Sequence, residues 1–214
     1  MNIALMMENS QAAKNALVLE QLQAVAAGNH DAVFNVGMKD ENDHSLTYIH
    51  LGIMASILLN SQAVDFVITG CGTGQGALMS LNAHPGVLCG YCIDPADAFL
   101  FAQINNGNAL SLPFAKGFGW GAELNVRYIF EKAFTGRHGE GYPVARKDVQ
   151  ACNANILNQV KKAVVKENYL DTLRAIDPEL VKTAVSGERF QQCLFEQGKD
   201  QEIIKFVKSV LGRG

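Results

Sequence analysis

One segment, residues 66–76, constrains the fold of this chain more than any other. The apolar run Phe66–Gly70 leads directly into a loop in which glycine occupies every second place up to Gly76. An unbroken apolar run of this length is typical of a strand buried on both faces of a parallel sheet. The apolar segment Ala77–Leu81 then predicts a helix, so the glycines form a strand-to-helix turn. The sequence therefore predicts an α/β fold.

Cys71 lies in that turn, at the predicted carboxyl end of the strand, where open α/β sheets bind ligands. Backbone N–H groups at the start of a helix favour a developing negative charge, and a thiol beside them can act as a nucleophile or base. The alternative is a buried, inert cysteine, which is the commoner case for a single cysteine. The loop lacks the Gly-Lys-Ser/Thr of a nucleotide-binding loop and is a poor match for a dinucleotide fingerprint.

Composition narrows the class of protein. The chain has 214 residues, of which 48% are hydrophobic and 18% charged, and this suits one globular domain with an appendage. A net charge of −3 with no basic cluster gives no reason to expect nucleic-acid binding. No apolar stretch reaches about 18 residues, so no membrane span is expected. The opening run Asn2–Met7 lacks a preceding basic region, which argues against a signal peptide.

Five cysteines occur in the chain, at positions 71, 89, 92, 152 and 193. Cys89 and Cys92 have C-x-x-C spacing, but they lie in a strand-like run. Residues three apart in a strand point to opposite faces, so a redox or zinc role is not expected. An odd number of cysteines without a disulfide pattern favours a reduced, cytoplasmic protein.

Strand-like runs alternate with helical patterns along the first 140 residues. We expect strands at residues 3–7, 32–36, 66–70, 87–93 and 109–112, and helices at residues 12–27, 48–60, 77–81, 95–103 and 122–134. Gly28 is expected to end the first helix, and Asp94-Pro95 to begin the fourth. This alternation predicts a three-layer α/β/α domain with a mostly parallel five-stranded sheet.

The pattern changes after Gly136, where a glycine-rich loop is followed by helical periodicity alone. Asp177-Pro178 and Asp200 are expected to cap helices in this part. We therefore divide the chain into an α/β domain, residues 1–140, and a helical C-terminal extension, residues 141–214. The extension is expected to pack on the core or on a partner subunit.

Several short motifs follow one another in residues 1–140. They are Gly70-Cys71-Gly72-Thr73-Gly74, Asn82, Pro85-Gly86, Asp94-Pro95, Asn105–Leu110 and Gly136-Arg137-His138. In this order they resemble the ribose-5-phosphate isomerase B and galactose-6-phosphate isomerase family. The resemblance implies aldose–ketose isomerisation of a phosphosugar through an enediolate, without metal or cofactor. It also implies a homodimer whose active sites lie between the two subunits.

The resemblance assigns roles to individual residues. Cys71 matches the thiol base, and Thr73 with the neighbouring N–H groups would hold the enediolate oxygen. Glu8 keeps the carboxylate that follows the first strand and is the third catalytic candidate. The substrate-binding candidates are Asn9, Tyr48, Gly72, Gly74, Gly76, Asn105, Arg137 and His138.

Other positions depart from the family's pattern. Ile104 replaces the ring-opening histidine, and isoleucine cannot transfer a proton. Gly141 replaces the second phosphate-binding arginine. Asn9 replaces a histidine, and Gln75 replaces the glutamate base of some members, which leaves Cys71 as the consistent base. His50 replaces a carboxylate and is a candidate acid–base group. Substitutes for the lost arginine are Lys116, Arg146 and Lys147.

Three functions remain open from the sequence. The first is isomerisation of a pentose or hexose phosphate. The second is isomerisation or epimerisation of another sugar or a sugar acid by the same loop. The third is a sugar-phosphate-binding protein that has lost turnover, for which the missing histidine argues and the retained thiol argues against. The remaining histidines at positions 30, 44 and 84 are expected at the surface.

Overall fold

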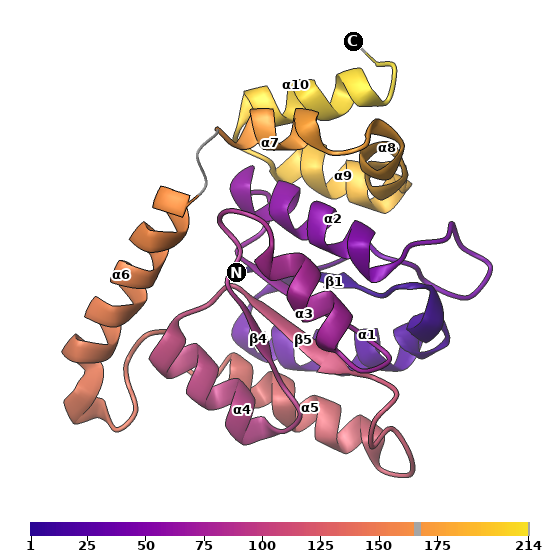
Figure 1. Cartoon of the computed structure of the whole chain (residues 1–214). Coiled ribbons are helices and arrows are strands. Elements are labelled where there is room, and N and C mark those ends of the chain that lie inside the picture. Colours follow the sequence, from indigo (N-terminus) through magenta and orange to yellow (C-terminus); the bar gives the residue numbers. More distant parts are fainter. Residues whose placement is uncertain (165–167, 214) are drawn as a thin grey trace.

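A computed structural model describes residues 1–164 and 168–213 of the chain. Its centre is a five-stranded sheet in the order β2-β1-β3-β5-β4, and every neighbouring pair is parallel (Figure 1). The strands are β1 (Asn2–Met6), β2 (Ala32–Asn35), β3 (Phe66–Cys71), β4 (Cys89–Tyr91) and β5 (Ala109–Pro113). The predicted fold class is confirmed, and the sheet is wholly rather than mostly parallel.

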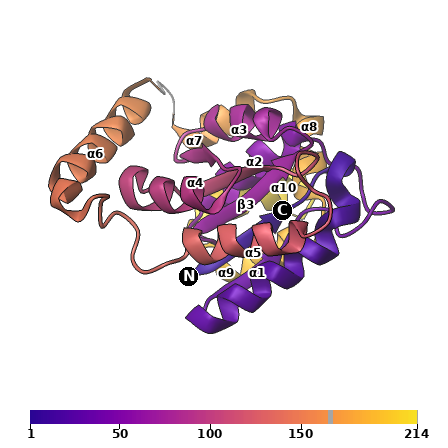
Figure 2. The same cartoon turned by 90° about the horizontal axis from the view of Figure 1, so that it is seen from below.

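Helices cover both faces of the sheet. One face carries α2 (Tyr48–Asn60) and α3 (Gln75–Asn82). The other carries α1 (Asn15–Asn29), α4 (Pro95–Leu100) and α5 (Ala122–Ala133), as Figures 1 and 2 show. All six residues of β3 are buried because helices lie on both sides of this central strand.

Several predicted boundaries are wrong, most clearly those of the first helix, the fourth strand and the fourth helix. The first helical segment begins as a 3-10 helix, η1 (Asn9–Lys14), and α1 continues through Gly28 to Asn29. His30 ends it in the left-handed conformation at φ 59°. The fourth strand is only three residues long. The fourth helix passes into a π-helical turn, η2 (Phe101–Asn105), rather than continuing as an α-helix to residue 103.

The C-x-x-C pair lies across the sheet as predicted. Cys89 belongs to the core on the α2 and α3 side, and Cys92 belongs to the core on the α1 and α5 side. Burial raises the pKa of Cys92 to about 12 and also raises the pKa of Cys89. Both thiols are therefore protonated core residues at neutral pH.

The extension begins with the short helix η3 (Val144–Arg146), and its described residues continue with five α-helices. They are α6 (Lys147–Val164), α7 (Tyr169–Ala175), α8 (Pro178–Val185), α9 (Glu188–Gln197) and α10 (Gln201–Val210). Asp177 and Asp200 accept backbone N–H groups at the starts of α8 and α10, which confirms both predicted caps.

Helices α7–α10 form a further layer on the outer side of α2 (Figure 1). Val181, Phe190 and Ile203 belong to the same buried cluster as Leu58 of α2 and Met6 of β1. The buried hydroxyl of Tyr169 lies 2.6 Å from Ser56 Oγ of α2. The extension thus shares its core with the α/β domain, as expected for packing on the core.

Helix α6 has a different position and stands beside the body of the molecule in both views (Figure 2). It packs against the π-helical turn η2, and Lys161 donates a hydrogen bond to the carbonyl oxygen of Val87. Its apolar residues Ile156, Leu157 and Val160 are about half exposed. Within residues 1–164 and 168–213, no helix combines the length and apolar character needed to cross a membrane.

Candidate active site

The carboxyl ends of the parallel strands meet at one edge of the sheet. Pairing of Met6 with Thr69, and of Cys71 with Pro113, aligns the ends of β1, β3 and β5. Glu8 and Asn9 follow β1 after one residue, so they lie at the same edge as Cys71. Cys71 is 7% exposed, which leaves its thiol sheltered at the rim of this edge. Ligand sites of parallel sheets are found at such edges.

The loop after Cys71 is held by its own backbone. Gly74 has φ 75° and caps α3, a conformation that a side chain would strain. Ser111 Oγ donates a hydrogen bond of 2.7 Å to the carbonyl oxygen of Gly74. Gly74, at the cap position, has no side chain to accept a backbone N–H of α3. Thr73 Oγ1 accepts the N–H of Gln75 at 3.4 Å, a long bond that an anionic oxygen could replace.

The segment after β1 faces this loop. A Cβ atom added at Gly72 would lie 3.5 Å from Nε2 of Gln11 and 4.0 Å from Oγ of Ser10. Glu8 is buried and accepts hydrogen bonds from the backbone N–H and the hydroxyl of Ser10. Ser10 therefore lies between the carboxylate and the glycine loop. The catalytic role of Glu8 stays a prediction.

Asn9 and Tyr48 complete this side of the site. The N–H of Asn9 donates to the carbonyl oxygen of Leu46 at 2.8 Å, which ties the segment after β1 to the loop before α2. The ring of Tyr48 lies 3.1 Å from the position of a Cβ atom at Gly76. Glycine at that place lets the aromatic ring approach the start of α3.

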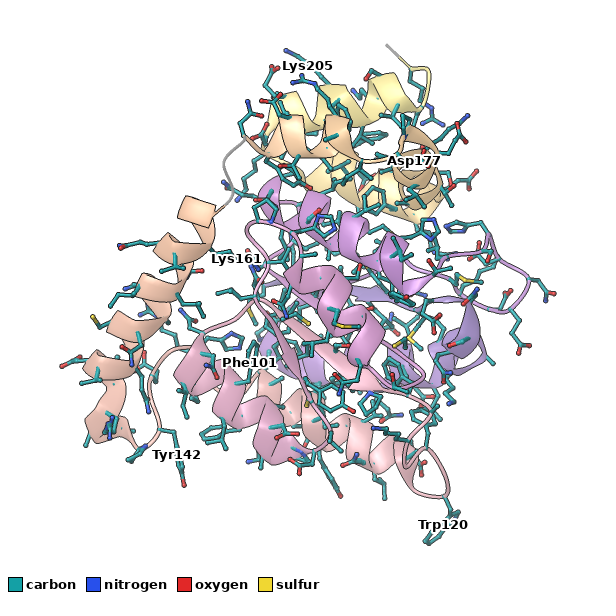
Figure 3. All side chains as sticks on the ribbon, viewed as in Figure 1. Phe101, Trp120, Tyr142, Lys161, Asp177 and Lys205 are labelled. Atoms are coloured by element: carbon teal, nitrogen blue, oxygen red, sulfur yellow. The ribbon has the colours of Figure 1, made fainter. Side chains whose placement is uncertain are left out.

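The remaining candidates lie at the opposite edge. Arg137 and His138 line a cavity of about 640 Å³ together with Met1 and Asp31, which precede β1 and β2. Asn105 ends η2, before β5, and so also lies towards the amino ends of the strands. Figure 3 shows Tyr142, beyond Arg137, on a different side of the molecule from Trp120, which follows β5. One chain alone does not bring Arg137 to Cys71.

The comparisons with known proteins give the family. The model described as Ribose/Galactose Isomerase matches residues 3–139, more than half of the chain. The chain belongs to the ribose/galactose isomerase family. A second model, described as Ribose-5-phosphate isomerase, matches residues 163–210 of the extension. The comparison with curated proteins found no match.

Two solved structures of this family resemble nearly the whole chain. The ribose-5-phosphate isomerase LacAB_rpiB of Vibrio parahaemolyticus is 70% identical, with 98% of this chain and 99% of that chain covered and a TM-score of 0.96. A 4-deoxy-L-threo-5-hexosulose-uronate ketol-isomerase complexed with tartrate is 50% identical, with 99% and 100% covered and a TM-score of 0.96.

A shorter relative shares only the fold. The type B ribose 5-phosphate isomerase of Trypanosoma cruzi is 16% identical, with a TM-score of 0.64. The match covers 77% of this chain and 98% of that chain. The isomerase fold is therefore common to all three structures, whereas the first two match this chain over its extension as well.

Several histidines are more buried than the sequence predicted. His50 is buried, and its Nδ1 accepts the backbone N–H of Thr47 at 2.9 Å as part of a helix cap. Burial, with the nearby His44, lowers the pKa of His50. His84 is buried rather than superficial, and His44 is half-buried beside Asp43 at 2.8 Å. The prediction that His44 and His84 are surface residues is wrong.

His138 is not a solvated loop residue. Its ring stacks on Phe134 and meets the ring of Phe66 edge-on, with the two centroids 5.6 Å apart. Its Nε2 is hydrogen-bonded to the carbonyl oxygen of Ala133 at 2.8 Å. Burial lowers its pKa, partly offset by the Ala133 bond and the charge of Asp31. Its role in substrate binding stays a prediction.

The three candidates for a second cation lie in different parts of the molecule. Lys147 lines a second cavity with Arg137 but forms an ion pair of 2.6 Å with Glu140. Lys116 lies at the Cys71 edge, with Nζ 3.4 Å from the hydroxyl of Tyr91. Arg146 ends the short helix η3. Lys116 is thus the candidate on the side of the glycine loop.

Two residues outside the predicted site shape the glycine loop. Tyr91 and Ser111 both donate hydrogen bonds to its carbonyl oxygens, at Thr73 and Gly74. Tyr91 is the last residue of β4, and Ser111 lies in the middle of β5. A tyrosine and a serine within otherwise apolar strands were the available signals.

Proposed function

We propose that this protein is a ketol-isomerase of a sugar acid such as 4-deoxy-L-threo-5-hexosulose uronate, with Cys71 as the base. The observation that carries the proposal is the pair of altered positions, Ile104 and Gly141, in a chain that otherwise keeps the thiol loop. A relative 50% identical over 99% of this chain is a ketol-isomerase for that uronate, and its structure holds the dicarboxylate tartrate.

The chemistry of that substrate explains why Ile104 is tolerated. The aldehyde of a 4-deoxy-5-hexosulose uronate has no hydroxyl at carbon 4, and carbon 5 is a ketone. The usual five- and six-membered rings of an aldose cannot close through those positions. A histidine for ring opening is then unnecessary, and isoleucine at position 104 costs nothing in catalysis.

The charge of the substrate explains Gly141 in the same way. A carboxylate carries one negative charge, and a single arginine can neutralise it with two parallel N–H hydrogen bonds from its planar guanidinium group. A phosphate carries more charge and benefits from a second cation. One remaining arginine, Arg137, therefore suits a uronate better than a phosphosugar.

Proton transfer follows from the geometry at the carboxyl edge. Cys71, as thiolate, takes the proton from carbon 2, and the electron pair forms the double bond of the enediolate. The thiol then returns the proton to carbon 1, while a proton passes from the oxygen on carbon 2 to that on carbon 1. We assign the second transfer to Glu8, and oxyanion stabilisation to Thr73 and the N–H groups of Gly72 and Gly74.

We further propose a homodimer with shared active sites. Arg137 and Asn105 lie at the amino edge of the sheet, away from Cys71, so a second copy must supply them to complete each site. The half-exposed apolar residues of α6 offer a surface for such a contact. The five cysteines form no disulfide bonds, which supports our proposal that the protein functions in the reducing cytoplasm.

A second candidate is isomerisation of a pentose or hexose phosphate. The 70%-identical Vibrio parahaemolyticus structure is described as a ribose-5-phosphate isomerase, and Lys116 at the Cys71 edge offers a cation for a phosphate. A protein that binds such sugars without turnover remains the third possibility from the sequence.

The test compares turnover of 4-deoxy-L-threo-5-hexosulose uronate, ribose 5-phosphate and galactose 6-phosphate by the purified protein. Incorporation of deuterium from solvent at carbon 1 of the product measures the enediolate step directly. We expect kcat/KM for the uronate to exceed that for either phosphosugar by at least about 100-fold, because sites built on polar contacts can discriminate by up to about 10,000- to 100,000-fold. A preference for a phosphosugar would establish the second candidate instead, and no exchange into any of them would favour a binding protein.

A further inference from the structure

One arginine connects the C-terminal extension to the loop before α2. Arg189 lies in the first turn of α9, and its Nε donates to the carbonyl oxygen of Asn35 at 2.8 Å. Its Nη2 donates to the carbonyl oxygen of Gly37 at 2.7 Å and to Oδ2 of Asp43 at 2.8 Å. A planar guanidinium can make these three bonds at once, and no other side chain has this arrangement of donors.

Asp43 organises the loop around that contact. Its Oδ2 also accepts the backbone N–H of Lys39 at 3.0 Å, and its Oδ1 accepts the backbone N–H of His44 at 2.8 Å. Burial would raise the pKa of Asp43, but the hydrogen bonds from His44, Lys39 and Arg189 hold it well below its usual range. The carboxylate is therefore charged and fixes the loop, residues 36–47, from within.

The same loop contacts the residues that follow β1. The N–H of Met38 donates to the carbonyl oxygen of Met7 at 3.0 Å. On the return path Leu46 accepts the N–H of Asn9 at 2.8 Å, and Nδ2 of Asn9 lies 3.5 Å from Oγ of Ser45. The position of Asn9 therefore depends on the shape of loop 36–47.

The loop also sets the start of α2. Thr47 caps the helix with the help of His50, and the next residue is Tyr48. The ring of Tyr48 lies against Gly76 of the thiol loop. A shift of loop 36–47 would move Tyr48 relative to Cys71, because only the cap separates the two segments.

We propose that Arg189 is a positioning residue for the isomerase, and that it holds loop 36–47 so that Asn9 and Tyr48 meet the substrate beside Cys71. The proposal rests on the proposed function for the roles of Asn9 and Tyr48. The extension then belongs to the architecture of the active site. This agrees with the matches, since the structures that are 50% and 70% identical extend over this part of the chain.

The variants are Arg189→Ala and Arg189→Lys, with Arg174→Ala as the matched control. Arg174 lies in α7 of the same extension and forms an ion pair of 2.8 Å with Asp171 of its own helix, so its loss removes an arginine without touching loop 36–47. Kinetics are measured on the substrate that the parent turns over fastest. Melting temperature is measured on every variant.

For Arg189→Ala we expect KM to rise about tenfold and kcat to fall by no more than about threefold, because substrate contacts loosen while the thiol loop stays in place. Arg189→Lys keeps the positive charge but not the planar set of N–H donors, so its KM should lie between those of the parent and Arg189→Ala. Guanidinium ion added at millimolar concentration should restore KM of Arg189→Ala and leave Arg174→Ala unchanged. A KM within twofold of Arg174→Ala, or no response to guanidinium, overturns the proposal.

Hydrogen–deuterium exchange decides the question without a substrate. In Arg189→Ala the amides of Asn9 and Met38 should exchange faster than in the parent, whereas in Arg174→Ala they should not. Unchanged exchange at both amides overturns the positioning role. If the parent turns over none of the three sugars, the proposed function fails while this measurement still stands. Should Arg189→Ala fail to fold, Asp43→Asn replaces it with the same expectations.

Discussion

The hydroxyl of Tyr91 donates a hydrogen bond of 3.0 Å to the carbonyl oxygen of Thr73. The last residue of β4 therefore supports the loop after β3, although β5 lies between the two strands. A Cβ atom at Gly74 would come within 2.6 Å of Cε2 of the same tyrosine. The ring and the glycine together fix the path of the backbone beside Cys71.

Replacing Tyr91 by phenylalanine should loosen the thiol loop without disturbing the core. The lost hydrogen bond is worth about 0.5–1.5 kcal/mol, and a misplaced oxyanion loop should lower kcat by roughly 3- to 10-fold. Steady-state kinetics with a melting curve check this. Tyr128→Phe, on the exposed side of α5, is the control and should match the parent. Equal kcat in Tyr91→Phe would mean that the loop holds its shape unaided.

Cys71→Ala should remove nearly all turnover and leave the fold intact. Loss of a general base typically lowers the rate by about 100- to 10,000-fold, and the small buried side chain is not a major part of the core. The measurement is kcat on the preferred substrate, together with circular dichroism. Cys152→Ala removes an exposed cysteine of α6 and serves as control. Activity of Cys71→Ala within a few-fold of the parent would assign the base to another residue.

The fold was predictable because its signals are local. The apolar run before Cys71, the Asp-Pro start at Asp94 and the Asp177 and Asp200 caps each act within a few residues, and each is found where expected. The end of the first helix was predicted wrongly, because glycine is not the only residue that can end a helix. Helix α1 continues through Gly28 because His30 accepts the left-handed conformation at its end.

Only the part of the site at the carboxyl edge of the sheet could be predicted from the sequence. Chain order places Glu8, Asn9 and the thiol loop at the carboxyl edge, and the structure brings them together. The pKa of His84 could not be predicted from the sequence, because burial lowers it and so does the charge of Lys161, which is 77 residues away along the chain. The separation of Arg137 from Cys71 could not be predicted from the sequence either, since the packing of α5 and of the loop after it sets the position of Arg137.

Stability should fall at mildly acidic pH because of His84. Burial, with the positive charge of Lys161, lowers its pKa from 6.5 to about 4. The unfolded chain therefore binds one more proton than the folded chain between these values, so the free energy of unfolding decreases as pH falls from about 6.5 to about 4, by about 3 kcal/mol in all. Above pH 6.5 this penalty is absent.

Urea unfolding of the parent and of His84→Asn at pH 4.5 and pH 7 measures this effect. The parent should lose more stability between the two pH values than the variant. His30→Asn changes an exposed histidine and should behave like the parent. An identical pH dependence in the parent and His84→Asn would show that other groups govern acid sensitivity.

Arg137→Ala should weaken the binding of the anionic end of the substrate. Loss of a charge-assisted contact costs about 1.5–3 kcal/mol, which corresponds to roughly 10- to 150-fold in affinity. The measurement is the inhibition constant of tartrate, a dicarboxylate, and of a phosphorylated sugar acid. Arg127→Ala is the control, because it removes a half-exposed arginine of α5 whose Nε lies 3.9 Å from Oε1 of Glu131. An unchanged inhibition constant would place the anion elsewhere.

Ile104→His should restore activity on cyclic sugars selectively. Ile104 lies in η2 and lines the cavity that also contains Arg137 and Lys147, so a histidine there would stand beside the proposed anion site. An acid–base group at this place should raise turnover of ribose 5-phosphate and galactose 6-phosphate by up to about 100-fold, and should change turnover of an open-chain substrate little. Ile104→Leu keeps the volume without a proton and should help neither. If the parent already turns over a cyclic phosphosugar as fast as an open-chain substrate, another group opens the ring, and Glu8 and His50 become the residues to replace.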